Sequence, residues 1–197
     1  MKDETIGNQQ GTPTEAEIAW LSGILEGEGT VTLGCWIRDK KKISKPKITA
    51  AITLYNTDAG ILKKAIAILE GLSLRFYVKE REQKPMKMAN GKKYGAPIPI
   101  THICVNHIED TYRLAKIIRP WMFGEKGNRL DIVVQYLARR LQKINEKGGE
   151  FRHACLDYGD VSLVADFYRK FVKSPRHNRE LVEGLLNEYE QPAAMEL

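Results

Sequence analysis

The segment Leu21–Gly29, which reads LSGILEGEG, ends an apolar stretch with two acids, Glu26 and Glu28, set among glycines. Upstream, Thr14 and Glu17 have the Thr-x-x-Glu spacing of a capping box, so we expect a helix to begin near Thr14. Both acids then lie at the C-terminal end of that helix, where the macrodipole disfavours anions. Carboxylates placed against this field favour a compensating cation, most simply a bound metal.

Small residues mark the same helix. Gly23 in mid-helix costs about 1 kcal/mol relative to alanine, and close approach of another backbone is the usual reason for such a glycine. Together with Ser22 and Gly27 it predicts tight contact with a second helix. The alternative is that these residues pack inside one chain, in a core helix that ends in a glycine-rich turn, which leaves Glu28 unexplained.

These nine residues resemble the LAGLIDADG signature of homing endonucleases, with Glu in place of Asp at both acidic positions. In that family two such helices pack side by side, and each delivers its second acid and the preceding carbonyl to divalent metal at the scissile phosphates. The resemblance implies that Glu28 and Gly27 bind the metal, expected to be magnesium. It also implies a dimer helix that includes Leu21, Ser22, Gly23, Leu25 and Glu26, with Glu26 helping to cap and pair the helices.

No second copy of the motif follows in the chain. Phosphodiester hydrolysis by two-metal nucleases needs several carboxylates around the metals, and one Glu28 cannot hold such a cluster well. A twofold dimer brings two Glu28 side chains together, one for each DNA strand, as in single-motif members of the family. The expected partners are therefore a second copy of the chain and a palindromic or nearly palindromic DNA.

The family layout implies two further catalytic positions. A polar residue after the second strand is expected to contact metal-bound water, and Asn56 is the nearest match, with Tyr55 as its rival. Asn56 is equally well explained as a turn residue before an Asp58 helix cap. A basic residue near the cleaved phosphate is best matched by Lys126, with Arg129 in reserve, although a solvated loop lysine is the simpler interpretation of Lys126.

Hydrophobic periodicity places the elements that must hold these residues. Strands are expected at Thr30–Ile37, Lys47–Leu54, Arg75–Arg81 and Ile100–Asn106. Helices are expected from Thr14, from Asp58 to Gly71, at Ile108–Ile118 and Arg129–Asn145, and once or twice between Asp160 and Tyr189, with Trp121–Asn128 a loop. This order predicts an α+β domain with a four-stranded antiparallel sheet, and it is the αββαββα order of the LAGLIDADG fold.

The strand pattern also predicts the DNA-binding surface, because a twisted antiparallel sheet fits the major groove. Candidate base or phosphate contacts alternate along the strands and are Thr30, Thr32, Trp36, Arg38, Lys47, Thr49, Thr53, Lys79, Arg81, His102 and Cys104. Loop lysines suited to phosphates are Lys40, Lys41, Lys42, Lys45, Lys84 and Lys87. Phe76 and Tyr77 are assigned to the core or its edge.

Composition agrees with a polyanionic partner. The 197-residue chain has a formal net charge of +6, and its three widely spaced cysteines predict no disulfide framework, which fits a cytoplasm or an organellar matrix or stroma. No stretch approaches the roughly 20 apolar residues that span a bilayer. We expect a disordered tail at 1–11, an endonuclease domain at 12–147 and a helical extension of it at 148–197.

Together these features predict a metal-dependent homing endonuclease that makes double-strand breaks in a long, near-palindromic DNA target and promotes intron mobility. One alternative is a maturase of the same fold that binds intron RNA. Another is a DNA-binding regulator that does not cleave, but such proteins usually lose the acid, so the intact Glu28 counts against it.

Overall fold

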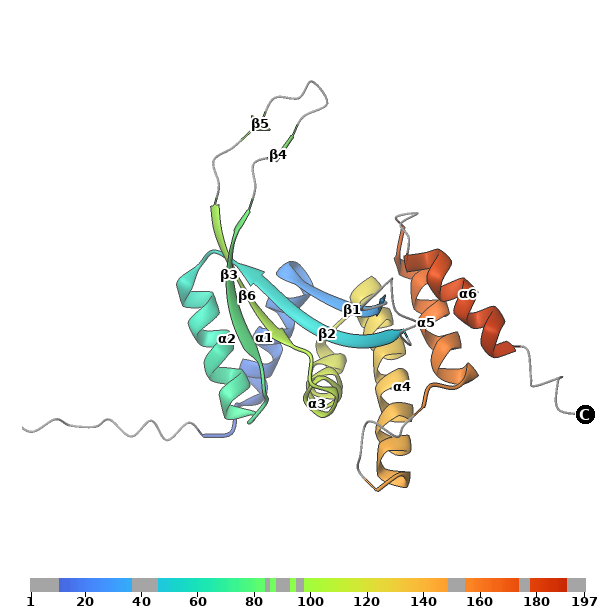
Figure 1. Ribbon diagram of the computed structural model, residues 1–197. Helices are drawn as coiled ribbons and strands as arrows, with labels where there is room; N and C mark the ends of the chain where they lie inside the picture. Colours follow the sequence, from blue (N-terminus) through green and yellow to red (C-terminus); the bar gives the residue numbers. More distant parts are fainter. Residues whose placement is uncertain are drawn as a thin grey trace, which may run out of the picture.

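A computed structural model describes residues 11–36, 46–83, 86–87, 93–94, 98–148, 155–173 and 178–190 (Figure 1). The helices are α1 (Glu15–Glu28), α2 (Ala59–Gly71), α3 (Ile108–Ile118), the 3-10 turn η1 (Arg119–Trp121), α4 (Gly124–Glu146), α5 (Tyr158–Phe171) and α6 (Asn178–Glu190). The strands are β1 (Gly29–Trp36), β2 (Lys47–Asn56), β3 (Tyr77–Gln83), β4 (Met86–Lys87), β5 (Lys93–Tyr94) and β6 (Ile98–Val105). None of the described helices is long and apolar enough to cross a membrane.

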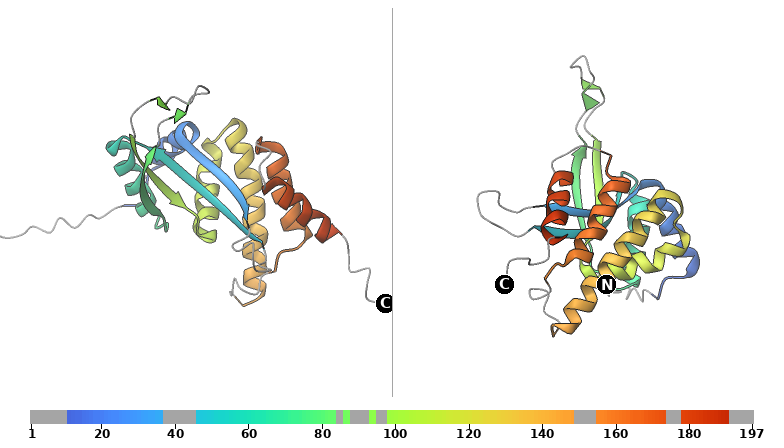
Figure 2. Two further views of the ribbon diagram at one scale, coloured as in Figure 1. Left: turned by 45° about the horizontal axis from the view of Figure 1, so that its top comes forward. Right: turned by 90° about the vertical axis from the view of Figure 1, so that its right-hand side faces the viewer.

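The main sheet has the strand order β1-β2-β6-β3, with every neighbouring pair antiparallel. Side chains alternate along each strand, so Val31, Leu33 and Ile52 are buried beneath α1–α4 while their sequence neighbours face away from these helices. Figure 2 shows β1 and β2 running across α3 and α4. The predicted α+β class and four-stranded antiparallel sheet are confirmed.

The entrance to α1 forms as the sequence predicts. The hydroxyl of Thr14 accepts a hydrogen bond from the Glu17 amide, and the Glu17 carboxylate accepts one from the Thr14 amide at 2.8 Å, which completes a capping box. The helix runs directly into β1 at Gly29. A side chain there would place its Cβ 2.5 Å from the carbonyl oxygen of Leu25, so this junction requires glycine.

Several predicted boundaries were wrong. The expected loop at 121–128 is largely helical, because α4 begins at Gly124. Gly127 lies inside this helix and is required by packing, since a Cβ there would lie 2.7 Å from the Met122 carbonyl oxygen. Strand β3 runs from Tyr77 to Gln83, two residues later at each end than expected, and just before it the Arg75 guanidinium pairs with Asp110 of α3 at 2.5 Å.

The C-terminal helices close the edge of the sheet. In α5, Val161, Val164 and Phe167 belong to the same hydrophobic core as β1. The Tyr168 hydroxyl accepts a hydrogen bond of 3.0 Å from the Cys35 amide of β1, so α5 covers the edge strand. The predicted division at residue 147 stays a prediction, and the predicted tail lies almost entirely outside the described residues.

Candidate functional site

The two acids of the motif lie where α1 meets β1. Glu28 is the last residue of α1 and is exposed, and the last turn carries no basic side chain of its own. Within the part of the chain that the structure describes, the Glu28 carboxylate has no hydrogen bond or ion pair. One oxygen of Glu26, Oε2, is buried and also lacks a hydrogen-bond partner there. The helix terminus therefore presents carboxylate oxygens that protein groups do not satisfy.

Lys126 brings a positive charge to this helix terminus from the first turn of α4. Its ammonium donates to the carbonyl oxygens of Leu25 at 3.1 Å and Gly27 at 3.4 Å, and also to that of Glu26. We had expected a metal ion as the simplest compensating cation, and the structure shows a lysine in contact with the carbonyls at the negative end of the dipole. The alternative interpretation of Lys126 as a solvated loop residue is wrong.

The reserve candidate, Arg129, has a different environment. Its guanidinium donates to Glu125 at 2.7 Å and to the Phe171 carbonyl at 3.2 Å, and it lies 5.2 Å from the ring centre of Phe171. These contacts tie α4 to α5. Lys126 is therefore the better candidate for the basic residue near the cleaved phosphate, although that role itself stays a prediction.

The outward face of α1 carries two glycines in its second half. Gly23 and Gly27 are exposed, and a Cβ added to either residue would meet nothing within 4 Å. Glu26 is half-buried, and its role in the dimer stays a prediction. The other three expected dimer residues lie on the opposite face: Leu21, Ser22 and Leu25 are buried in the protomer's own core, and the Ser22 hydroxyl donates to the Ile18 carbonyl at 2.8 Å. Their assignment to a dimer contact is corrected, because they have no surface left to offer another chain.

The choice between Asn56 and Tyr55 is also informed by the structure. Asn56 Oδ1 accepts a hydrogen bond from the Asp58 amide at 2.8 Å, which is the turn role that we had kept open. Tyr55 has the strand parity of Thr53 and therefore lies on the sheet face turned away from α1–α4. Because the register pairs Gly29 with Leu54, this places Tyr55 next to the end of α1. The arrangement favours Tyr55.

The open face of the sheet carries the exposed members of the predicted DNA-binding set. Lys79 and Arg81 are exposed along β3. Trp36 is 40% exposed at the far end of β1, where the Lys47 ammonium lies 5.5 Å above its ring. Thr30, Thr32 and Thr49 share this face with partial exposure.

The middle of that face differs from the prediction. His102 is only 4% exposed and lies between the ring edges of Tyr55 and Tyr77, at centroid distances of 5.5 and 5.7 Å. Cys104 and Thr53 are also buried, with the Thr53 hydroxyl 3.4 Å from the Cys104 sulfur. With so little exposed surface, these three side chains cannot contact a DNA base directly. Their assignment as direct contacts is therefore corrected.

Tyr77 lies beside His102 on the same face. Tyr77 is 45% exposed on the open face, so its assignment to the core or its edge was wrong, although the alternation with Lys79 and Arg81 already contained the signal. A hydrogen bond with Cys104 raises the pKa of Tyr77 to about 12, with burial adding to it.

Burial, followed by the charges of Arg81 and Lys79, lowers the pKa of His102, which is therefore neutral near pH 7.

Several predicted contacts lie outside the described residues. These are Arg38, Lys40, Lys41, Lys42, Lys45 and Lys84. Lys87 lies in β4, but only its backbone is described.

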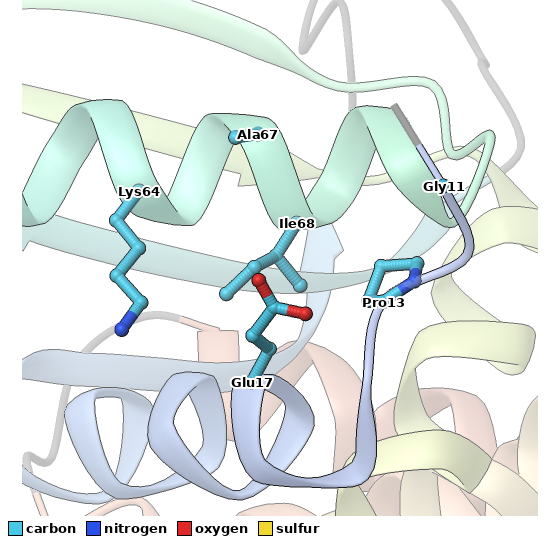
Figure 3. Close-up of a pocket in the computed structure, with 6 residues that line it drawn as sticks. All are labelled: Gly11, Pro13, Glu17, Lys64, Ala67 and Ile68. Atoms are coloured by element: carbon cyan, nitrogen blue, oxygen red, sulfur yellow. The ribbon is translucent and has the colours of Figure 1, made fainter. Parts of the chain in front are cut away.

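A cavity of about 170 Å³ between α1 and α2 lies at the opposite end of α1 from Glu28 (Figure 3). Its charged groups are already used, because Glu17 belongs to the capping box and the Lys64 ammonium lies 4.4 Å above the Trp20 ring. We therefore place the candidate site at the C-terminal end of α1.

The donors at that end suit a hard divalent cation, since they are carboxylate and carbonyl oxygens. The Glu28 carboxylate, the Gly27 carbonyl and the unsatisfied Oε2 of Glu26 are the oxygens available. Among the described residues, no group of three His, Cys, Asp or Glu side chains could hold a metal ion. One protomer therefore offers only part of a ligand set.

No family model and no curated protein matches the sequence. Solved structures do match the fold. The homing endonuclease I-CvuI, in complex with its target in the presence of Ca, is 13% identical with a TM-score of 0.57, covering 90% of this chain and 96% of that one. The group I intron-encoded homing endonuclease I-CeuI, complexed with DNA, is 12% identical with a TM-score of 0.55, covering 90% of this chain and 77% of that one.

A third match is the LAGLIDADG homing endonuclease I-SmaMI bound to cleaved DNA, which is 10% identical with a TM-score of 0.55 and covers 91% of this chain and 50% of that one. Together with the observed order of helices and strands, these matches show that the chain has the LAGLIDADG homing endonuclease fold.

Proposed function

We propose that this protein is a homodimeric, site-specific DNA endonuclease that uses magnesium to make double-strand breaks in a long, near-palindromic target and so promotes the mobility of an intron. One observation carries the proposal: the Glu28 carboxylate, which has no partner among the described residues, ends a helix whose outward glycines, Gly23 and Gly27, leave room for a second copy. The fold neighbours agree, since they are homing endonucleases solved with DNA and, for I-CvuI, with Mg or Ca.

The dimer follows from the shape of α1. A GxxxG spacing of glycines lets two helix backbones approach closely, and no side chain of the described residues covers Gly23 or Gly27. Contact along this stripe would bring two α1 termini together at a twofold axis, with one Glu28 for each DNA strand.

At the C-terminal end of each α1 helix, different residues would carry different parts of the reaction. Glu28 and the Gly27 carbonyl would hold the divalent ion, which supplies positive charge at the phosphate and a lowered pKa for bound water. Lys126, from α4, would stabilise the charge that develops on the phosphate and its leaving oxygen. The hydroxyl of Tyr55, at the end of β2, would orient the attacking water.

DNA would lie along the open face of the sheet. Lys79 and Arg81 can read guanine in the major groove, and Tyr77 adds a rigid aromatic edge between them and the middle of the sheet. Lys47 and Trp36 extend the surface toward the far end of β1 and β2. We expect the loop lysines to contact phosphates, which position the duplex without specifying its sequence.

Selection of cleaved sites from a randomised DNA library, with magnesium present, tests this function. We expect recovered sites that are long and close to palindromic, and no recovery in EDTA. Binding of DNA without cleavage would favour the regulator, and binding of structured intron RNA in its place would favour the maturase. An asymmetric consensus would contradict the homodimer.

A further inference from the structure

The last carbonyl groups of a helix have no partners within the helix, so other groups must satisfy them. In α1 the Gly29 amide takes one of them, since it donates to the Leu25 carbonyl. The ammonium of Lys126 contacts the carbonyl oxygens of Leu25, Glu26 and Gly27, three successive residues. A single side chain therefore caps the helix terminus at which both acids lie.

The backbone that carries Lys126 is firmly held. The Arg119 guanidinium forms two hydrogen bonds with Asp131, at 2.6 and 2.9 Å, and a third with the Met122 carbonyl at 3.0 Å. These bonds fix the turn from η1 into α4. Gly127 packs against the same Met122 carbonyl, at a distance that excludes a side chain. Lys126 can therefore change its contacts through its own flexible side chain while α4 stays in place.

Two cations compete for one oxygen in this arrangement. The Gly27 carbonyl accepts from Lys126, and it is also the carbonyl that the proposed function assigns to the metal. An ammonium and a divalent ion on the same oxygen would repel each other. Both cannot keep their preferred distances, so one of them must move.

We propose that Lys126 is an internal counter-cation: its ammonium caps the carbonyls of α1 in the metal-free protein and leaves the Gly27 carbonyl when a divalent cation binds. The inference rests on the proposed function, because it uses the metal ligands named there. It explains how α1 keeps Glu26 and Glu28 at its negative end without a metal. It also gives Lys126 its route to the phosphate, since the released ammonium remains beside the cleavage site.

The direct test observes the lysine itself. Side-chain ¹H–¹⁵N signals of Lys NH3⁺ groups are seen when hydrogen bonds slow their exchange with water, and Lys126→Met assigns the one that belongs to Lys126. We expect a protected signal in the metal-free full-length protein. Titration with Ca²⁺ alone, a cation that the same oxygens can bind without turnover, should shift or broaden this signal.

Thermal denaturation supplies the second measurement. Lys126→Met should lower the melting temperature of the metal-free protein and should raise the affinity for Ca²⁺ by about three-fold or more, since no ammonium has to be displaced. Lys64→Met is the matched control. It removes a lysine that lies over Trp20 near the other end of α1, and it should leave Ca²⁺ affinity unchanged.

The outcomes separate the two proposals. A Lys126 signal that persists at saturating Ca²⁺, or equal Ca²⁺ affinity in Lys126→Met and the wild type, overturns the counter-cation even if the protein cleaves DNA. No effect of Ca²⁺ on any variant overturns it as well. If Ca²⁺ displaces Lys126 but the protein cleaves no DNA, the counter-cation inference stands and the proposed endonuclease function is refuted.

Discussion

Two charged clusters of this protein use the same residue types in opposite ways. Between α4 and α5, Lys143 lies 2.5 Å from Asp157 and 2.6 Å from Asp160, and Arg139 and Arg140 pair with the same carboxylates. At the end of α1, Glu28 has no ionic partner among the described residues, and the nearby Lys126 ammonium contacts only carbonyl oxygens.

The difference separates structural charge from charge available for chemistry. In the α4–α5 cluster every acid has an ionic partner, although Oδ1 of Asp160 has only the ion pair with Arg139 at 3.4 Å and no hydrogen bond among the described residues. Burial raises the pKa of Asp157, but hydrogen bonds from Lys143, the Asp160 backbone and Arg139 together lower it to about 2. At the end of α1 a cation and an anion lie close together without pairing, which leaves Glu28 free to bind a group from outside the chain.

The largest expected effect on activity comes from a substitution at Glu28. Glu28→Gln should abolish cleavage with magnesium, because the amide cannot replace a charged metal ligand. Specific DNA binding and the melting temperature should stay close to wild type, since Glu28 is exposed and has no ionic partner in the part of the chain that the structure describes. Cleavage rate, gel-shift affinity and calorimetry on one preparation check all three, and unimpaired cutting would refute the metal-binding role.

The opposite behaviour is expected in the α4–α5 cluster. Asp160→Asn removes the centre of a buried network, because the Asp160 side chain is fully buried against Arg140 and Lys143. Loss of one partner of a buried ion pair typically costs about 3–5 kcal/mol, so urea denaturation should show a large loss of stability. Cleavage per folded molecule should be unchanged at low temperature. A catalytic defect in the folded fraction would contradict a purely structural role for the α4–α5 cluster.

The dimer contact beside Glu28 can be tested separately from folding. Gly23→Leu adds a side chain to open space in the protomer, so we expect a folded monomer that no longer makes double-strand breaks. Gly23→Ala is the graded control, and in a monomer it should stabilise α1 by up to about 1 kcal/mol. Analytical ultracentrifugation measures the association, and a leucine variant that remains dimeric would place the interface elsewhere.

Substitutions on the DNA-binding face of the sheet should have smaller effects. Lys79→Ala and Arg81→Ala should each weaken binding and relax specificity at particular base pairs by roughly 1–3 kcal/mol for each direct contact. Affinity for a panel of single-base target variants shows whether the loss depends on sequence. A uniform loss, with a reduced salt dependence, would mean that these residues touch only phosphates.

The smallest effect concerns the buried His102. Its pKa in the folded state is lowered from 6.5, so below that pH the unfolded chain binds the additional proton and stability should fall as the solution becomes more acidic. His102→Phe keeps a ring between Tyr55 and Tyr77 but cannot titrate. Urea unfolding at about pH 7.5 and about pH 5.5 should show a smaller loss in the variant, and equal losses would contradict a neutral His102.

Local patterns predicted a large part of this structure. The capping box at Thr14 and the alternation in β1 depend on residues close in sequence, so they could be read directly. The contact of Lys126 with Gly27 joins residues far apart in the chain, and no local pattern indicates it. The burial of His102 depends on tyrosines from two neighbouring strands, so it follows from the sheet register rather than from the composition of β6.

The central claim is that each protomer supplies one Glu28 for one DNA strand. A heterodimer of a wild-type protomer and a Glu28→Gln protomer, purified through two different affinity tags, tests it on a selected target with magnesium. We predict that this heterodimer nicks a single strand of each duplex and leaves the other intact. Double-strand breaks by the heterodimer, or the loss of both cuts, would contradict the claim.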